Sequence, residues 1–203
     1  MSNDLLQYEK EIWEKGELLV GIDEAGRGPL AGPVVIAGVV FPAGYYHPEI
    51  NDSKKLSAKK REALFDEIKD NALYYEIRIV SAKEIDESNI YAVTKNAMSE
   101  IALMLPVNEV LTDAMPLSIE KHVQSIIKGD AKSISIAAAS ILAKVTRDHI
   151  MEEYDAIYPQ YNFKKHKGYG TKEHLAALEK YGPCPIHRYS FAPVFQSTQP
   201  KLF

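Results

Sequence analysis

Four acidic residues carry the strongest chemical signal in the sequence. Asp23 and Glu24 end one apolar run, Asp113 ends another, and Asp148 lies in a long stretch of helical character. Clustered carboxylates repel one another, and a multivalent cation offsets that repulsion. Oxygen donors without cysteines, and without two histidines at ligand spacing, suit Mg²⁺ or Mn²⁺ better than zinc. Two such ions about 3.5–4 Å apart can stabilise the attacking and leaving oxygens of a phosphodiester displacement.

Each acid also has a purely structural explanation. Asp113 can cap the turn that follows it, and Asp148 can pair with Lys144 four residues earlier on a helix. Asp23 and Glu24 are adjacent, so a regular strand points them to opposite faces. They converge only if the strand ends or bulges, which the nearby Gly26 would permit. Spacing alone therefore leaves a shared metal site open.

A glycine-rich segment follows the first two acids. Gly26-Arg-Gly28-Pro-Leu-Ala31 matches the spacing of a dinucleotide-binding motif, which requires a helix directly after it. Here Pro33-Val-Val-Ile follows, which favours a strand, so the dinucleotide interpretation is rejected. The glycines either form a turn with positive φ angles or allow a ligand to contact the backbone beside Arg27.

The hydrophobic pattern predicts the elements that position these residues. Five strands are expected, at Glu17–Asp23, Pro33–Phe41, Tyr74–Ser81, Asn108–Thr112 and Val123–Ile127. The main helices are expected from Ser57 to about Lys69, at Tyr91–Leu105, from Ser133 or Ser135 to about Ile157, and at Thr171–Tyr181, with an amphipathic helix in residues 1–16. Strands followed by alternating helices and strands indicate an α/β fold with a mixed sheet.

Composition narrows the class of protein. The chain has 203 residues, a hydrophobic content of 46% and one cysteine, Cys184. We expect one compact unit in a reducing compartment, the cytoplasm, because no disulfide can form within the chain and no apolar run approaches the ~20 residues of a membrane span. The net charge of −4 argues against a nucleic-acid partner. However, residues 159–203 carry seven Lys and Arg against two Asp and Glu, and five further basic residues lie close together at Lys54, Lys55, Lys59, Lys60 and Arg61.

Five segments together resemble the signature of the ribonuclease HII family. They are, in family order, Gly21-Ile-Asp-Glu-Ala-Gly-Arg-Gly-Pro-Leu-Ala-Gly-Pro33, Asp52-Ser-Lys-Lys-Leu56, the run from Gly129 to Asp148, His166-Lys-Gly-Tyr-Gly-Thr171 and Pro185-Ile-His-Arg-Tyr-Ser-Phe-Ala-Pro193. They cover about residues 17–195. The resemblance implies a ribonuclease H-like mixed five-stranded sheet at 17–158, preceded by the helix at 1–16 and followed by a small, basic helical region at 159–203 that contacts the substrate.

The resemblance also implies an activity. Members of this family hydrolyse the RNA strand of RNA–DNA hybrids and cleave 5′ of single ribonucleotides embedded in duplex DNA, as endonucleases of DNA replication and repair. Two Mg²⁺ or Mn²⁺ ions act together, so products carry 3′-hydroxyl and 5′-phosphate ends. Position by position, the four metal-binding and catalytic acids correspond to Asp23, Glu24, Asp113 and Asp148.

The same comparison suggests substrate contacts. Gly26, Arg27 and Gly28 resemble the family element whose backbone contacts the ribose 2′-hydroxyl, the group that separates RNA from DNA. Tyr169 matches the tyrosine that packs on the sugar at the RNA–DNA junction. The phosphate-contact candidates are Lys54, Lys144 and Arg147. No role follows for His187 or Arg188, although both lie in a family motif.

One departure and two alternatives accompany the resemblance. Many members follow the third acid with Gly, whereas Ala114 and Met115 follow Asp113 here, which puts the shape of that loop in question. The sister ribonuclease HIII family usually has Lys in place of Arg27, Glu as the fourth acid and an added N-terminal domain. An inactive hybrid-binding module is the other alternative, and four retained acids oppose it because surplus negative charge weakens hybrid binding. We expect a monomer, with no membrane association.

Overall fold

A central five-stranded sheet organises the computed structural model, which describes residues 5–199. The ends of the predicted outer segments, residues 1–4 and 200–203, lie outside the described residues. The strand order is β3-β2-β1-β4-β5. β1 pairs antiparallel with β2 and parallel with β4. The strands are β1 (Leu19–Ala25), β2 (Val34–Val40), β3 (Tyr74–Val80), β4 (Glu109–Asp113) and β5 (His122–Ile126).

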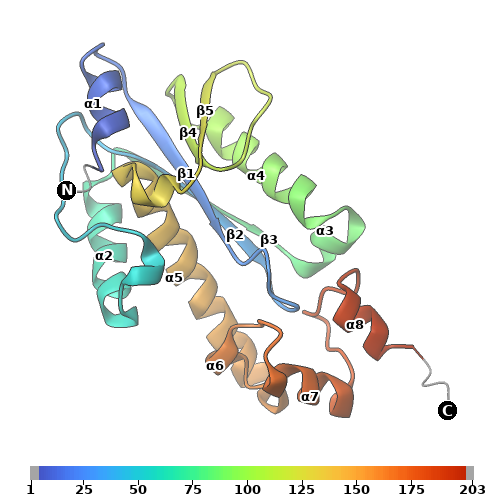
Figure 1. Cartoon of the computed structure of the whole chain (residues 1–203). Coiled ribbons are helices and arrows are strands. Elements are labelled where there is room, and N and C mark those ends of the chain that lie inside the picture. Colours follow the sequence, from blue (N-terminus) through green and yellow to red (C-terminus); the bar gives the residue numbers. More distant parts are fainter. Residues whose placement is uncertain (1–4, 200–203) are drawn as a thin grey trace.

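Helices cover both faces of this sheet (Figure 1). The 24-residue helix α5 (Ile134–Ile157) packs on β1 and β2, with α2 (Ala58–Asn71) beside it. On the other face, α4 (Ile90–Met104) packs on β2 and β3, next to α3 (Ala82–Glu87). The short α1 (Gln7–Trp13) lies near the start of α5. Each face therefore has its own apolar core, and both cores share the central strands.

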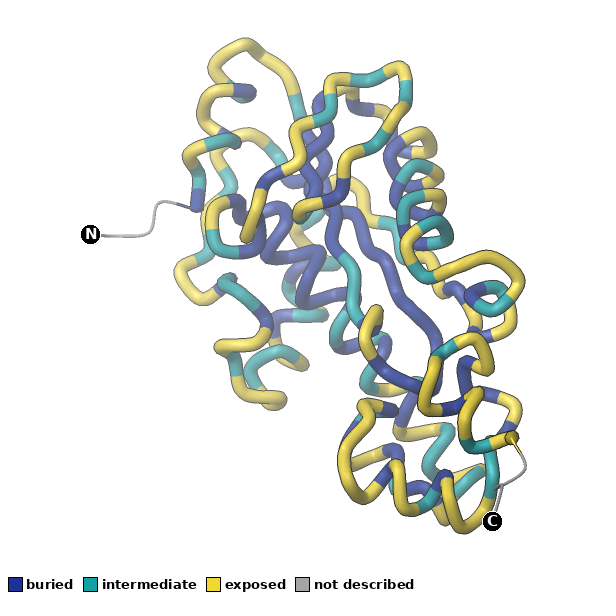
Figure 2. The backbone as a smooth tube through the Cα atoms, turned by 45° about the vertical axis from the view of Figure 1, so that its right-hand side comes forward, coloured by how far each residue is buried: buried dark blue, intermediate teal, exposed yellow. Residues whose placement is uncertain are grey.

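The C-terminal residues form a separate helical layer at one end of the sheet (Figure 1). It consists of α6 (Phe163–His166), α7 (Lys172–Tyr181) and α8 (Ala192–Ser197). Tyr161, Phe163 and Ile186 bury their side chains against Ala31 and Met151, so this layer packs on the glycine-rich segment and on the end of α5. Figure 2 shows much of these helices exposed on the outside, whereas the central strands β1, β2 and β4 and most of α5 are buried.

The sheet and its flanking helices confirm the predicted mixed five-stranded fold. Each predicted strand and long helix is present, with ends that shift by up to two residues. The helices α6 and α8 were not predicted, because each has six residues or fewer and shows no helical period. The boundaries at residues 16 and 158 stay a prediction. None of the helices within residues 5–199 combines the length and apolar character needed to cross a bilayer.

The long helix α5 is fixed against β1 by a close backbone contact. The Ser133 side chain accepts a hydrogen bond from the Ile136 N–H and so caps the helix, as predicted. At Gly21 on β1, a Cβ atom would lie 2.3 Å from the backbone carbon of Ser135. Glycine is therefore required for the first turn of α5 to approach the strand, and this approach brings the segment before α5 to the end of the sheet.

Candidate active site

Three carboxylates meet at the end of the sheet. Asp23 lies near the end of β1 and Asp113 ends β4, and these neighbouring strands are parallel, so their carboxyl ends share one edge. Asp130 comes from a 3-10 turn at Gly129–Ala131, just before α5. One oxygen atom from each of these three carboxylates lies within 4.8 Å of the others.

Local hydrogen bonds hold these acids in place. Asp113 Oδ1 accepts a hydrogen bond from the Gly129 N–H at 2.8 Å, which ties the end of β4 to the turn that carries Asp130. Asp23 Oδ1 accepts from the Glu24 N–H at 2.7 Å. The Ser133 N–H donates to the Gly129 carbonyl, and Ser133 also caps α5. The start of the helix therefore sets the position of the turn.

The electrostatics of the group favour a bound cation. Burial raises the pKa of Asp23 well above its usual range, and the charges of Glu24 and Asp113 add to this effect. Burial also raises the pKa of Asp130, together with the nearby Asp52 and Asp113. Such carboxylates resist ionisation next to one another, and a divalent cation removes that conflict. The donor set, oxygen atoms alone, suits Mg²⁺ or Mn²⁺.

Glu24 lies beside this group without a bulge in the strand. β1 stays in register with β2 through both acids, so Asp23 and Glu24 leave opposite faces of the strand. Both nevertheless line one pocket, because the strand ends there. Glu24 Oε1 is 3.4 Å from Arg27 Nη1, whereas its buried Oε2 has no hydrogen-bond partner within the described residues. An orphaned, buried carboxylate oxygen of this kind fits a metal ligand.

The structure separates Asp148 from the other predicted ligands. Ser140 on α5 lines the pocket with Asp23, and Asp148 lies eight residues further, about 12 Å along the helix. The Asp148 carboxylate instead pairs with Lys144 at 2.6 Å and with Arg61 at 3.9 Å. This pair is the structural alternative that the spacing had left open.

Asp130 takes the place in the group that the sequence had assigned to Asp148. It was overlooked because it lies in a three-residue turn without a hydrophobic period, although it is part of the matched run from Gly129 to Asp148. The sequence feature that could have identified Asp130 is its position three residues before Ser133, the predicted cap of the long helix. An acid there faces the start of α5, which packs against β1.

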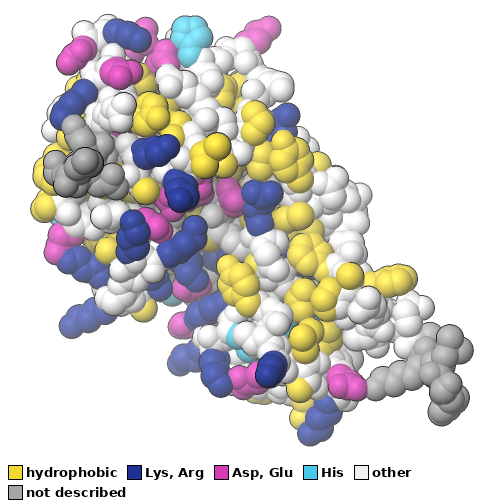
Figure 3. Space-filling view, in the orientation of Figure 1, with side chains coloured by type: hydrophobic (Ala, Val, Ile, Leu, Met, Phe, Trp, Pro, Cys, Tyr) yellow, Lys and Arg dark blue, Asp and Glu magenta, His cyan; other side chains and the backbone are white. Residues whose placement is uncertain are grey.

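A pocket of about 240 Å³ brings together most of the predicted site residues. Its lining includes nine of them, namely Asp23, Glu24, Gly26, Arg27, Gly28, Lys54, Lys144, Arg147 and Tyr169. In Figure 3, Lys and Arg side chains gather around acidic ones in the middle of one face. Such a surface combines a cation-binding centre with groups that attract phosphates.

The glycine-rich segment and Tyr169 lie next to each other in the lining of this pocket. Gly26 has a φ angle of +99°, which favours glycine, so the segment turns sharply after β1. A Cβ atom on Gly28 would lie 3.7 Å from the Tyr169 ring. The Tyr169 side chain is 47% exposed, and the guanidinium of Arg147 lies 5.9 Å from its ring centroid. A free aromatic face beside an exposed backbone suits a sugar.

The three predicted phosphate contacts differ in their surroundings. Lys54 is exposed, with its ammonium group 3.8 Å from Asp130, so it can reach a bound phosphate. Lys144 already pairs with Asp148. Arg147 is 1% exposed, and its guanidinium donates hydrogen bonds to the carbonyls of Ala31 and Pro33. It therefore holds the backbone of the segment that leads into β2.

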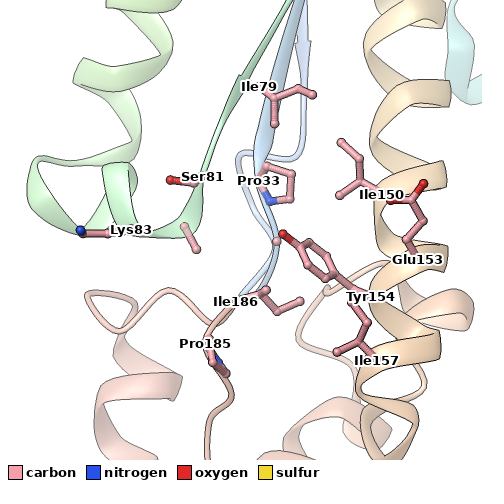
Figure 4. A pocket seen from close by; sticks show the side chains of 12 residues that line it. Pro33, Ile79, Ser81, Lys83, Ile150, Glu153, Tyr154, Ile157, Pro185 and Ile186 are labelled. Carbon is pink, nitrogen blue, oxygen red and sulfur yellow. The ribbon is translucent and has the colours of Figure 1, made fainter.

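A larger cavity, of about 380 Å³, contains none of the predicted residues (Figure 4). It lies between β3, the end of α5 and the C-terminal segment, and Ile79, Ile150, Tyr154 and Ile186 give it apolar walls. Glu153 and Lys83 are the charged residues of its lining. Without a cluster of acids or nucleophiles, this cavity does not offer the chemistry found in the smaller pocket.

Comparison with known proteins decides the family. The sequence model of the family described as Ribonuclease HII matches residues 20–194, nearly the whole chain. The chain belongs to the ribonuclease HII family. It is 54% identical over 189 residues to a ribonuclease HII of Lactobacillus helveticus, which covers 92% of this chain and 76% of that protein. It is therefore a ribonuclease H enzyme that acts on RNA–DNA hybrids.

Solved structures support the same fold. The ribonuclease H2 of Pyrococcus horikoshii superimposes with a TM-score of 0.73 at 28% identity and covers 89% of this chain and 96% of its own. A Bst-RNase HIII crystallised with Mn²⁺ superimposes with a TM-score of 0.66 at 14% identity, covering 89% and 69%, and so shows the fold alone. The family match thus favours ribonuclease HII over the ribonuclease HIII alternative. Membership in an enzyme family likewise favours an enzyme over an inactive binding module.

Proposed function

We propose that this enzyme cleaves the RNA strand of RNA–DNA hybrids and also cuts 5′ of single ribonucleotides embedded in duplex DNA. The observation that carries this proposal is the position of the three carboxylates of Asp23, Asp113 and Asp130 beside the Gly26–Gly28 segment, of which Arg27 and Gly28 are exposed. An enzyme whose cleavage centre lies next to a group that recognises one 2′-hydroxyl requires only one ribonucleotide in its substrate, not a run of ribonucleotides.

The metal ligands of this proposal are Asp23, Glu24, Asp113 and Asp130, with Asp130 in place of Asp148. Two divalent ions, Mg²⁺ or Mn²⁺, would activate water and stabilise the leaving 3′-oxygen, and the products would then carry 3′-hydroxyl and 5′-phosphate ends. The chain itself contributes the fixed positions of these acids, through the Gly129 N–H bond to Asp113 and the capped start of α5. No side chain of the pocket is needed as a nucleophile.

Other pocket residues would bind and orient the substrate. The N–H groups of the Gly26–Gly28 segment would contact the ribose 2′-hydroxyl, and Tyr169 would pack against the sugar at the RNA–DNA junction. Lys54, being exposed, would attract the phosphate nearest the acids. Lys144 would serve mainly to neutralise Asp148, and Arg147 to hold the loop.

We further propose that the enzyme acts as a monomer in the cytoplasm, in DNA replication and repair. Ribonucleotides incorporated into DNA are the natural source of the single-ribonucleotide substrate. The absence of sustained heptads in the sequence, and its single cysteine, Cys184, which is buried, support a monomer that needs no disulfide-linked partner.

The test is cleavage of a DNA duplex that contains one ribonucleotide, in Mg²⁺, Mn²⁺ and EDTA. Asp23→Asn and Asp130→Asn should each lower kcat by more than about 100-fold, because each removes a metal ligand. Asp148→Asn removes a partly buried charge from α5 and should retain most of the activity. Full activity of Asp130→Asn together with loss in Asp148→Asn would contradict the assignment, and cleavage in EDTA would contradict the metal mechanism.

A further inference from the structure

Arg188, which precedes α8, is completely buried beneath the glycine-rich loop formed by residues 26–32. Its exposed fraction is 0%. All three of its guanidinium nitrogens donate to backbone carbonyls: Nε to Gly32 at 3.0 Å, Nη1 to Arg27 at 2.9 Å and Nη2 to Gly26 at 2.6 Å. Burial, followed by the charge of Arg147, lowers the pKa of Arg188 to about 9. A buried cation is costly unless its hydrogen bonds are satisfied, and here the loop carbonyls satisfy them.

These bonds fix the direction of the loop's N–H groups. In a trans peptide the carbonyl and the following N–H point in opposite directions. Since the carbonyls of Gly26 and Arg27 point inward to Arg188, the N–H groups of Arg27 and Gly28 point away from it. Neither N–H donates a hydrogen bond within residues 5–199, and both residues line the pocket. The donors are thus left free on the side where a ligand would bind.

The C-terminal segment is held in register with the loop, which keeps Arg188 in this position. The Arg188 N–H donates to the Leu30 carbonyl, the Gly32 N–H donates to the Ile186 carbonyl, and Ala31 forms a β-bridge with His187. The Phe191 ring lies 5.2 Å from the Arg188 guanidinium and covers it. These contacts join residues about 160 positions apart in the sequence.

We infer that Arg188 is a positioning residue for ribose recognition: its guanidinium turns the Gly26–Gly28 backbone so that two N–H donors face the sugar. This inference rests on the proposed function and names the residue that makes the 2′-hydroxyl contact possible. A lysine cannot reproduce these bonds, because its three donors radiate from one nitrogen atom, whereas the guanidinium donates from three nitrogen atoms spread in one plane. Without the clamp, the peptide planes of the loop can rotate and the donors lose their direction.

The experiment compares binding and cleavage by Arg188→Lys with the parent enzyme. Affinities are measured in Ca²⁺ for two duplexes that differ only by one 2′-hydroxyl, one all-DNA and one with a single ribonucleotide. In Arg188→Lys, the ratio of the two affinities should fall towards one while affinity for the all-DNA duplex stays unchanged. The kcat/KM for cleavage in Mg²⁺ should fall about 100-fold, as expected for misplacement of a reacting group.

Two further variants separate positioning from stability. Leu64→Ala in α2 removes a buried side chain far along the sequence from the loop, so it should lower stability and leave the affinity ratio unchanged. Phe191→Leu keeps Arg188 but loosens its cover, and should lower the ratio to an intermediate value even if Arg188→Lys does not fold. A parent-like affinity ratio in a folded Arg188→Lys variant would overturn the inference. If the lysine variant does not fold, a parent-like affinity ratio in Phe191→Leu would overturn it. A ratio of one in the parent enzyme would instead contradict the proposed function.

Discussion

A buried pair of histidines makes the stability of this protein depend on pH. His187 Nε2 lies 3.0 Å from His174 Nε2, and His174 Nδ1 lies 2.9 Å from the Tyr169 carbonyl. Because a carbonyl only accepts, His174 carries its proton on Nδ1, and its Nε2 must accept from His187. The other nitrogen of His187 accepts from the Cys184 N–H at 2.9 Å. Both rings are therefore neutral. A second proton on His187, at Nδ1, would point at the Cys184 N–H, which is itself a donor.

The size of the effect follows from the shift at His187. Burial, followed by the charge of His174, lowers the pKa of His187 from 6.5 to about 4. The folded protein therefore binds fewer protons than the unfolded chain between these values, and stability falls as the pH falls through this window. The shift is worth about 3 kcal/mol in total, of which about 2 kcal/mol is lost between pH 7 and pH 5. Burial and the charge of the neighbouring His166 also lower the pKa of His174, which adds to the loss in the same direction.

Urea denaturation at pH 7 and pH 5 measures this loss directly. His187→Gln should be less stable than the parent at pH 7, since it disturbs a buried network, but it should lose about 2 kcal/mol less on acidification. His149→Gln is the control, because His149 is half exposed on α5 and lies outside the network. If the parent and His187→Gln lose the same free energy between the two pH values, the neutral-pair interpretation is wrong.

Two further substitutions test the backbone that supports the site. Gly21→Ala should lower the free energy of unfolding by about 3 kcal/mol, measured by urea denaturation, because its Cβ would lie 2.3 Å from the Ser135 backbone; parent-like stability would contradict the close contact with α5. Ala114→Gly should raise the urea midpoint by an amount equivalent to about 0.5–1 kcal/mol, because Ala114 has a φ angle of +50°; a lower midpoint would show that this conformation is not strained.

The fold and two of the metal-binding candidates were predictable because their signals are local. β-branched runs mark the strands, and a helix cap at Ser133 marks the start of α5. Asp23 and Asp113 end strands that prove to be parallel neighbours, so one edge of the sheet brings them together. In the loop after Asp113, Ala114 itself takes the left-handed conformation that favours glycine, and the Thr112 hydroxyl donates to the Met115 carbonyl.

The positions of Asp130 and Asp148 depend on packing that sequence patterns do not contain. Both acids lie in one matched motif, and only the approach of α5 to β1 decides which of them meets Asp23. The roles of Arg147 and Arg188 were hidden for a related reason. A sequence shows a basic residue but not its burial, and these two buried guanidinium groups donate hydrogen bonds to loop carbonyls.

The net charge of −4 does not argue against a nucleic-acid partner once the positions of the acidic residues are known. At least three carboxylates lie within the site that a polyanionic substrate must enter, next to Lys54 and Lys144 on the pocket wall. Without cations these carboxylates repel a phosphate, and burial, with the charges of neighbouring carboxylates, raises the pKa of Asp23 and of Asp130. Divalent ions reverse both effects at once. Substrate binding and metal binding should therefore strengthen each other, so the overall acidity of the chain is compatible with a nucleic-acid partner.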